Sequence, residues 1–146
     1  MMKRRIYQGC CMLFGITLSL SCKNEVADLI KDEPVKDISG TWKIVSLTRN
    51  GEELASRLDL SKFRITFNAD GTYTLQDQMA FTVSGPGSYE LNDSQYPSGL
   101  IMTQEGKAPE KMTFQFPVVA GKRQLSLTLS PGCTGNTYQY NFAREN

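Results

Sequence analysis

Apolar and polar residues alternate with a period of two through most of the chain that follows residue 38. The alternation is clearest in residues 62–67 and 124–130, where every second side chain is Phe, Ile or Leu. Successive side chains of a β-strand point to opposite faces of a sheet, so this pattern predicts strands with one buried and one solvated face. The predicted strands cover residues 42–48, 62–67, 72–76, 81–84, 88–92, 100–104, 113–116, 124–130 and 137–142.

Turn-forming residues separate the predicted strands. Asn68-Ala69-Asp70-Gly71 predicts a tight hairpin in which Gly71 supplies the positive φ. A short helix is expected within residues 54–60. Short antiparallel strands joined by hairpins predict an all-β domain, an up-and-down barrel of about eight or nine strands, with a β-sandwich as the alternative. Further reversals are expected at residues 85–87, 120–122 and 132–136.

The first 21 residues have the composition of a secretory signal peptide. Lys3, Arg4 and Arg5 form a basic start, and residues 9–20 form an apolar run. A membrane-spanning helix needs about 20 apolar residues, and this run is much shorter. We therefore expect residues 1–21 to be removed on maturation, together with the two cysteines that they contain.

Residues 18–22, Leu-Ser-Leu-Ser-Cys, place small residues before Cys22. The stretch resembles a bacterial lipobox, in which such a cysteine is lipidated and becomes the first residue of the mature protein. We expect Cys22 to carry a lipid that anchors the protein in a membrane, residues 22–37 to form a charged tether, and residues 38–146 to form the barrel. The alternative is an ordinary signal-peptidase site near Ser21, which would leave Cys22 as a free thiol.

The charge balance makes the lipid the expected membrane anchor. The chain has 16 basic and 15 acidic residues, and loss of the signal peptide removes three basic ones. The mature chain then has a formal charge of −2, which predicts neither a nucleic-acid partner nor attraction to an anionic membrane surface. Lys23-Asn24-Glu25 resembles the surface-export signal of Bacteroidetes lipoproteins. We therefore expect an outer-membrane lipoprotein, at the cell surface in preference to the periplasmic face.

The residue types argue against an enzyme. The chain has no histidine, which excludes Ser-His-Asp and Cys-His catalysis as well as histidine-ligated zinc and haem. Cys133 would be the one remaining free thiol. The nearest carboxylate pairs lie in or beside predicted turns, where solvated charge is the simpler interpretation. No catalytic residue, metal or cofactor is predicted; the pairs are Glu52 with Glu53, Glu90 with Asp93, and Glu105 with Glu110.

Aromatic residues are the feature most suggestive of binding. Many of them would line one side of the sheet, where they could form an apolar pocket with tyrosine hydroxyls as polar handles. The alternative is a packed core, because an eight-stranded barrel is only just wide enough for its own side chains. The candidate ligand-lining residues are Tyr73, Phe81, Tyr89, Phe114, Tyr138 and Tyr140.

Two sequence features resemble lipocalins. Gly40-Thr41-Trp42 is similar to their Gly-x-Trp motif, and Arg144 stands where they place an arginine against that tryptophan. Residues 38–144 more closely resemble the lipocalin-like domain of uncharacterised Bacteroidetes lipoproteins, a domain of unknown function, through residues 40–45, 63–73 and 123–127. The resemblance implies that Gly40, Trp42 and Arg144 close one barrel end. It also implies non-enzymatic binding of a small apolar or glycan-derived ligand, with docking of another envelope protein by a packed barrel as the alternative.

Overall fold

The computed structural model describes residues 33–77, 81–132 and 135–145. The chain divides into two units, Met1–Glu33 and Pro34–Asn146, and nearly all of the described residues belong to the second unit. That unit contains ten β-strands, and the described residues include no helix. No helix long and apolar enough to cross a membrane is therefore found in the described ranges.

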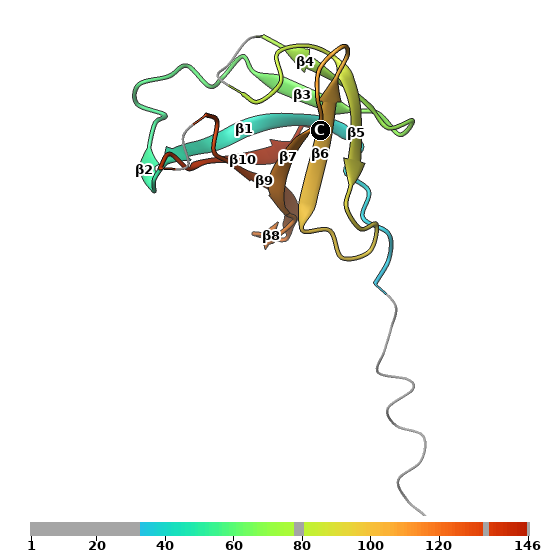
Figure 1. Cartoon of the computed structure of the whole chain (residues 1–146). Helices are drawn as coiled ribbons and strands as arrows, with labels where there is room; N and C mark the ends of the chain where they lie inside the picture. The colour runs from blue at the N-terminus through green and yellow to red at the C-terminus, as the bar shows by residue number, and fades with distance from the viewer. Residues whose placement is uncertain (1–32, 78–80, 133–134, 146) are drawn as a thin grey trace, which may run out of the picture. The chain divides into compact units, whose positions relative to one another are not determined.

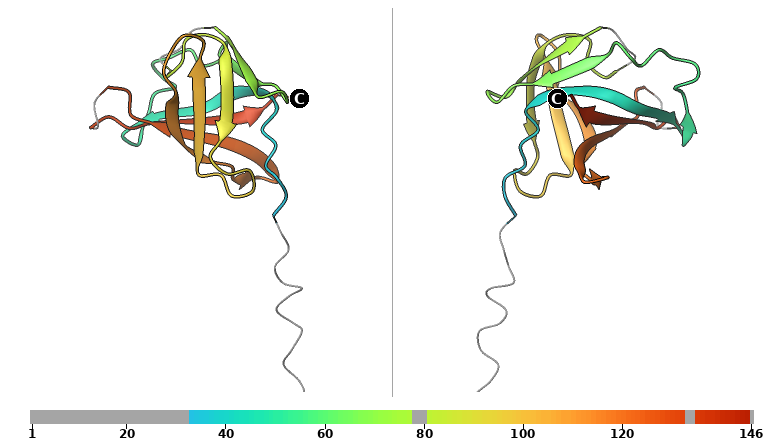
Figure 2. Two further views of the ribbon diagram at one scale, coloured as in Figure 1. Left: turned by 45° about the vertical axis from the view of Figure 1, so that its right-hand side comes forward. Right: turned by 180° about the vertical axis from the view of Figure 1, so that it is seen from behind.

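Eight of the strands form a closed antiparallel barrel (Figures 1 and 2). The ring closes because β10 pairs with both β1 and β9. Two short strands lie outside it: β2 pairs with β1, and β8 pairs with β9. The strands are β1 (Gly40–Arg49), β2 (Glu52–Glu53), β3 (Arg64–Phe67), β4 (Thr72–Gln76), β5 (Gly87–Leu91), β6 (Gly99–Gln104), β7 (Glu110–Gln115), β8 (Val118–Val119), β9 (Lys122–Leu129) and β10 (Tyr138–Arg144).

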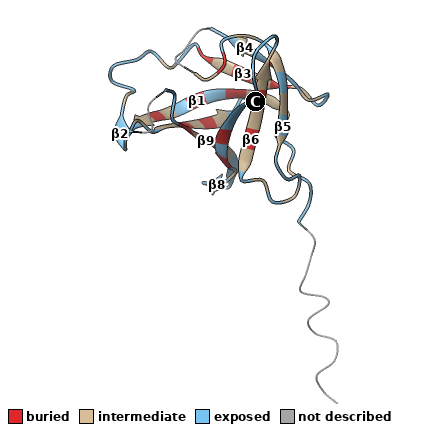
Figure 3. Cartoon of the chain, in the orientation of Figure 1, coloured by how far each residue is buried: buried red, intermediate tan, exposed pale blue. Residues whose placement is uncertain are grey.

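The period-two pattern produces this barrel by placing alternate side chains inside. Buried and less buried residues alternate along β1 (Figure 3). The buried residues Trp42 and Ile44 are two apart, but the next one, Leu47, is three further on. A register shift between Ile44 and Ser46, typical of a β-bulge, inserts the extra residue and keeps Leu47 pointing inward.

The predicted all-β barrel is confirmed, and the sandwich alternative is wrong because the ring of strands is closed. Gly71 has the predicted positive φ, at 83°. The expected strand at residues 81–84 is absent: this segment is irregular, with Val83 buried and the backbone N–H of Ser84 donating to the Gln104 side chain.

The expected helix at residues 54–60 is also wrong. This segment consists of turns, with one helix-like hydrogen bond from Leu58 N to Leu54 O of 3.2 Å. Leu54 and Leu60 pack against the core, whereas Leu58 is exposed. A helix would not bury Leu54 and Leu60 on one face, so the segment packs them against the core as a loop instead.

Candidate functional site

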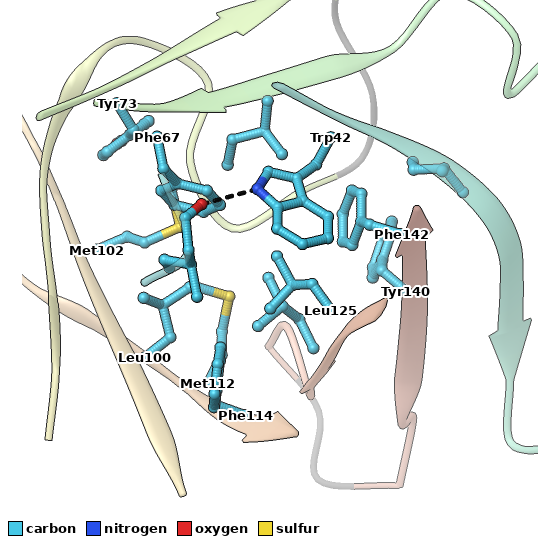
Figure 4. Packing of buried hydrophobic residues seen from close by; sticks show 14 of the residues in the cluster. Trp42, Phe67, Tyr73, Leu100, Met102, Met112, Phe114, Leu125, Tyr140 and Phe142 are labelled. Atoms are coloured by element: carbon cyan, nitrogen blue, oxygen red, sulfur yellow. Dashed lines mark hydrogen bonds between the residues drawn. The ribbon is translucent and has the colours of Figure 1, made fainter. Parts of the chain in front are cut away.

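Four of the six candidate ligand-lining aromatics pack against other aromatic rings. Tyr140 contacts Phe81 edge to face, with ring centroids 5.2 Å apart, and stacks on Phe142 at 6.3 Å. Phe81 also lies 6.0 Å from Phe63. Edge-to-face and offset contacts at these distances are the favourable packing arrangements for aromatic rings. This part of the predicted pocket is an aromatic cluster, of which Figure 4 shows Tyr140 and Phe142.

The other four candidate residues lie elsewhere in the barrel. Tyr89 packs edge to face on Phe67 at 4.7 Å, and its hydroxyl donates to the Asn68 carbonyl at 2.9 Å. Phe114 contacts the ring of Phe116 at 5.9 Å. Tyr138 lies under the guanidinium of Arg49, 5.9 Å from the ring centroid. Tyr73 is fully buried.

Burial decides the ionisation of the interior tyrosines. It raises the pKa of Tyr140 to about 12, with a smaller contribution from the charge of Tyr138. Burial also raises the pKa of Tyr73 and of Tyr89. These hydroxyls stay neutral at physiological pH, so they can donate or accept hydrogen bonds but cannot act as bases. All three tyrosines belong to the hydrophobic core or pack against it.

Trp42 and Arg144 are in contact at one end of the barrel, as the lipocalin resemblance implies. The guanidinium carbon of Arg144 lies 4.9 Å from the Trp42 ring centroid, within cation–π range. The indole N–H of Trp42 donates to the Ile38 carbonyl at 2.8 Å (Figure 4), and Arg144 Nη2 donates to the Asp37 carbonyl at 3.2 Å. Gly40 has φ 125°, a conformation that side chains rarely adopt.

Further aromatic and cationic contacts extend from this pair to the outer surface. The Phe116 ring lies 6.0 Å from Trp42, edge to face. The guanidinium of Arg123 lies 5.4 Å from the Phe116 centroid and donates to the Phe116 carbonyl at 2.8 Å. Arg144, Trp42, Phe116 and Arg123 therefore form a continuous chain of contacts from the barrel end to the start of β9.

A surface depression of about 1090 Å³ lies along these contacts. Four basic and two acidic side chains line it, which leaves a formal excess of two positive charges. Phe116 and Val119 supply apolar surface. The complete lining is Asp37, Lys43, Phe116, Val119, Ala120, Lys122, Arg123, Gln124, Ala143, Arg144 and Glu145.

The two acids of this depression already have partners. Glu145 pairs with Arg64 at 2.8 Å, and the hydrogen bond from Arg64 is the main reason why the Glu145 pKa is lowered. Asp37 accepts a hydrogen bond from the Ser39 N–H at 2.8 Å, and hydrogen bonds from Ser39 lower its pKa. In the described part of the chain, neither Lys43 nor Lys122 forms an ion pair. Lys122 can therefore offer its ammonium group to an anion, whereas the charge of Lys43 already helps to lower the pKa of Glu145.

A second depression, of about 560 Å³, is lined in part by the Arg64–Glu145 ion pair. Its lining is almost wholly polar and includes Ser61, Lys62 and Gln76. It has no aromatic or aliphatic side chain that could hold an apolar ligand. Binding of the apolar ligand expected from the sequence is therefore not favoured there, and the glycan-derived alternative is untested.

Glu53, one of the carboxylates considered in the sequence, has a structural role. Glu53 accepts hydrogen bonds from the Ser46 hydroxyl at 2.8 Å and from the Leu47 N–H at 3.2 Å, and these lower its pKa. Among the described residues, no group of three potential ligands could hold a metal ion. Cys22 and Cys133 lie outside the described residues.

Sequence reasoning missed the basic depression. Its residues come from β1 and the segment before it, from the connection between β7 and β9, from β9 itself and from the end of β10. No local motif connects them. One local signal was available, because Val118 and Val119 directly precede Ala-Gly-Lys-Arg. That pattern predicts a two-residue hairpin turn with an apolar arm and a basic arm.

One family comparison gives a result. The model of the family described as a domain of unknown function, DUF5004, matches residues 20–143. No curated protein and no solved structure matches the chain. The expectation of a family of unknown function is confirmed at this level, and the match names neither lipocalins nor Bacteroidetes. Since the match covers most of the sequence, the chain belongs to the DUF5004 family.

Proposed function

We propose that this chain is a lipid-anchored, non-enzymatic lipoprotein of the bacterial cell envelope, whose packed lipocalin-like barrel presents its surface to another envelope component. The observation that carries the proposal is the aromatic packing inside the barrel. Residues expected to surround a ligand instead contact Phe63, Phe67, Phe116 and Phe142. A barrel filled in this way acts through its outer surface and loops.

The organisation of the chain supports lipid anchoring through Cys22. The compact barrel unit begins at Pro34, so eleven residues separate it from Cys22. The family match begins at residue 20, close to the expected mature N-terminus, and leaves out most of the expected signal peptide. A barrel joined to a membrane by such a segment is the arrangement of an outer-membrane lipoprotein of Bacteroidetes, displayed at the cell surface in preference to the periplasmic face.

Intact-mass spectrometry of the membrane-purified protein tests the anchor. The expected mass is that of a chain starting at Cys22 with added acyl chains. An unmodified Cys22, or a chain that retains residues 1–21, would show that the anchoring proposal is wrong. Native mass spectrometry of protein from its own host then tests the packed barrel, which should carry no small molecule.

Ligand binding inside the barrel is the second candidate function, and one observation favours it. The hydroxyl of Tyr73 and that of Thr82 are buried without a hydrogen-bond partner among the described residues. Buried polar groups normally have partners, so a small bound molecule with a polar group could satisfy them. A reproducible extra mass that is lost on denaturation would support this candidate and contradict the packed scaffold. Tyr73→Phe should then weaken retention of that molecule.

A further inference from the structure

We propose that the barrel end nearest the tether docks on the surface of an anionic lipid bilayer. We call this surface the tether-side rim and define it by residues 34–37, residues 92–98 and residues 118–123. The inference rests on the proposed lipid anchor at Cys22. It adds that the barrel itself contacts the lipid, and that its orientation on the membrane is therefore fixed.

Exposed apolar side chains concentrate on this rim. The described residues include six large apolar or aromatic side chains that are exposed. Four of the six belong to the rim: Val35 (65% exposed), Tyr96 (62%), Val118 (57%) and Val119 (45%). Single exposed valines need no explanation, but such a concentration at one end marks an interaction surface. Tyrosine and aliphatic side chains are also the types that enter a membrane interface.

The three segments lie toward the same end of the barrel. Strand β8, the connection from β5 to β6, and the segment that precedes β1 all lie at the lower end in Figure 1 and in both views of Figure 2. A hydrogen bond from the Lys36 N–H to the Ser94 carbonyl, 2.7 Å long, ties two of the segments together. A flat surface could therefore contact all three.

The charges beside β8 match an anionic surface. Lys122 and Arg123 follow the two exposed valines across the hairpin turn, and Lys43 and Arg144 line the depression beside them. Glu145 and Asp37 in the same depression are held by Arg64 and by Ser39. Basic residues at the edge of an exposed apolar group bind acidic headgroups while the apolar side chains enter the interface.

The length of the preceding chain favours a bilayer over a distant partner. Eleven residues separate Cys22 from Pro34, and even a fully extended chain of that length spans only about 40 Å. A lipid on Cys22 therefore keeps the rim within that distance of the bilayer. The formal charge of −2 for the mature chain predicts no membrane attraction, but the rim itself has a formal charge of +1, from Lys36, Lys122 and Arg123 against Asp37 and Asp93.

A depth-sensitive probe tests the docking in the lipidated protein. In a Cys133→Ser background, Val119→Cys and Leu58→Cys each receive an environment-sensitive fluorophore, and the protein is placed in anionic vesicles that contain brominated lipids. The two positions are matched, because both side chains are 45% exposed. We expect quenching of about half the fluorescence at position 119, as for a group just below the headgroups, and none at position 58.

Charge reversal tests which lipids the rim recognises. Each basic residue near an anionic surface contributes about a fivefold preference, so Lys122→Glu with Arg123→Glu should lower docking at position 119 by about 25-fold or more. The matched control is Lys107→Glu with Lys111→Glu, which makes the same change of charge away from the rim and should leave quenching unchanged. Vesicles of phosphatidylcholine alone should dock the parent protein much more weakly.

Each outcome decides the inference. If the protein floats with vesicles but the probe at position 119 is not quenched, the anchor is present and rim docking is wrong; a protein partner would then be the occupant to seek. If quenching at position 119 is the same with and without the Lys122 and Arg123 substitutions, the rim does not recognise acidic lipid. If the protein does not float with vesicles, the anchor proposal fails and this inference fails with it.

Discussion

The tyrosine hydroxyls of the barrel differ in whether they have a partner. Tyr89 donates to the Asn68 carbonyl at 2.9 Å, whereas Tyr73 is buried without a partner among the described residues. A hydrogen bond in this setting stabilises by about 1 kcal/mol, and an unsatisfied buried hydroxyl costs a similar amount. The two residues therefore allow a matched comparison of the same substitution.

Tyr89→Phe should lower the free energy of unfolding by about 1 kcal/mol, and Tyr73→Phe should leave it unchanged or raise it by up to about 1 kcal/mol. Urea titration followed by the fluorescence of Trp42, the single tryptophan, measures both. Tyr96→Phe, at an exposed position, is the control. A loss of stability in Tyr73→Phe would mean that its hydroxyl has a partner, such as a bound molecule.

Tyr140 should make the barrel sensitive to alkaline pH. Burial raises its pKa to about 12 from an ordinary value of 10.0, so the unfolded chain ionises first as the pH rises. Stability is fully present below pH 10 and is lost between pH 10 and 12, by about 2 kcal/mol after discounting for solvent screening. Unfolding measured on both sides of this window should show a smaller loss in Tyr140→Phe. An equal loss in both proteins would contradict this assignment.

Arg144 should stabilise the barrel more than Arg49 does. Arg144 lies 4.9 Å from the Trp42 ring, which is buried, whereas Arg49 lies 5.9 Å from the partly exposed Tyr138 ring. Arg144→Gln should cost about 1–2 kcal/mol of unfolding free energy and Arg49→Gln less than about 1 kcal/mol. Arg49 also donates two hydrogen bonds to Asn136 Oδ1, at 2.8 and 3.2 Å, but both are exposed. Equal costs in a urea titration would contradict the greater stabilisation expected from Arg144.

At the scale of the elements, two hairpins use the same turn with different residues. Asn50 and Gly51 join β1 to β2 with φ of 51° and 86°, and Ala120 and Gly121 join β8 to β9 with φ of 50° and 77°. Positive φ at both central positions is the signature of a type I′ turn, which favours Asn-Gly. Ala120 is therefore strained where Asn50 is not.

Ala120→Asn should stabilise the protein by about 0.5–1 kcal/mol because asparagine accepts positive φ more readily than alanine. Asn50→Ala should destabilise it by about 1–2 kcal/mol, since the Asn50 side chain also accepts a hydrogen bond from the Thr137 N–H at 2.8 Å. Thermal unfolding of the two variants checks both signs. A destabilised Ala120→Asn protein would contradict this account of the turn.

The same scale shows how far the sequence could predict the fold. Strands with regular alternation, such as β3, β4 and β10, were predictable because local periodicity alone places their side chains. Residues 81–84 and 54–60 were not, because their conformations depend on contacts with Gln104 and with the core across the barrel. The bulge between Ile44 and Ser46 was hidden for a similar reason: pairing with β10 determines it.

At the scale of the whole molecule, the candidate site was the least predictable feature. The basic depression joins Asp37, Lys43, Phe116, Lys122 and Arg144, which become neighbours only when β10 closes the barrel between β9 and β1. Of the candidate aromatic residues, Tyr73, Phe114 and Tyr140 are buried and the other three are partly buried, but composition does not distinguish a packed interior from a lined cavity. Only the ring-to-ring distances favour packing.

Anchoring and folding should be separable in this molecule. The barrel unit starts at Pro34, and among the described residues the first strand of its ring begins at Gly40. Cys22→Ser should move the protein from the membrane fraction to the soluble fraction, because it removes the site of the proposed lipid. Its urea midpoint should equal that of the parent protein. A Cys22→Ser protein that stays with the membrane would indicate another anchor, and a shifted midpoint would show that residues before Pro34 do support the barrel.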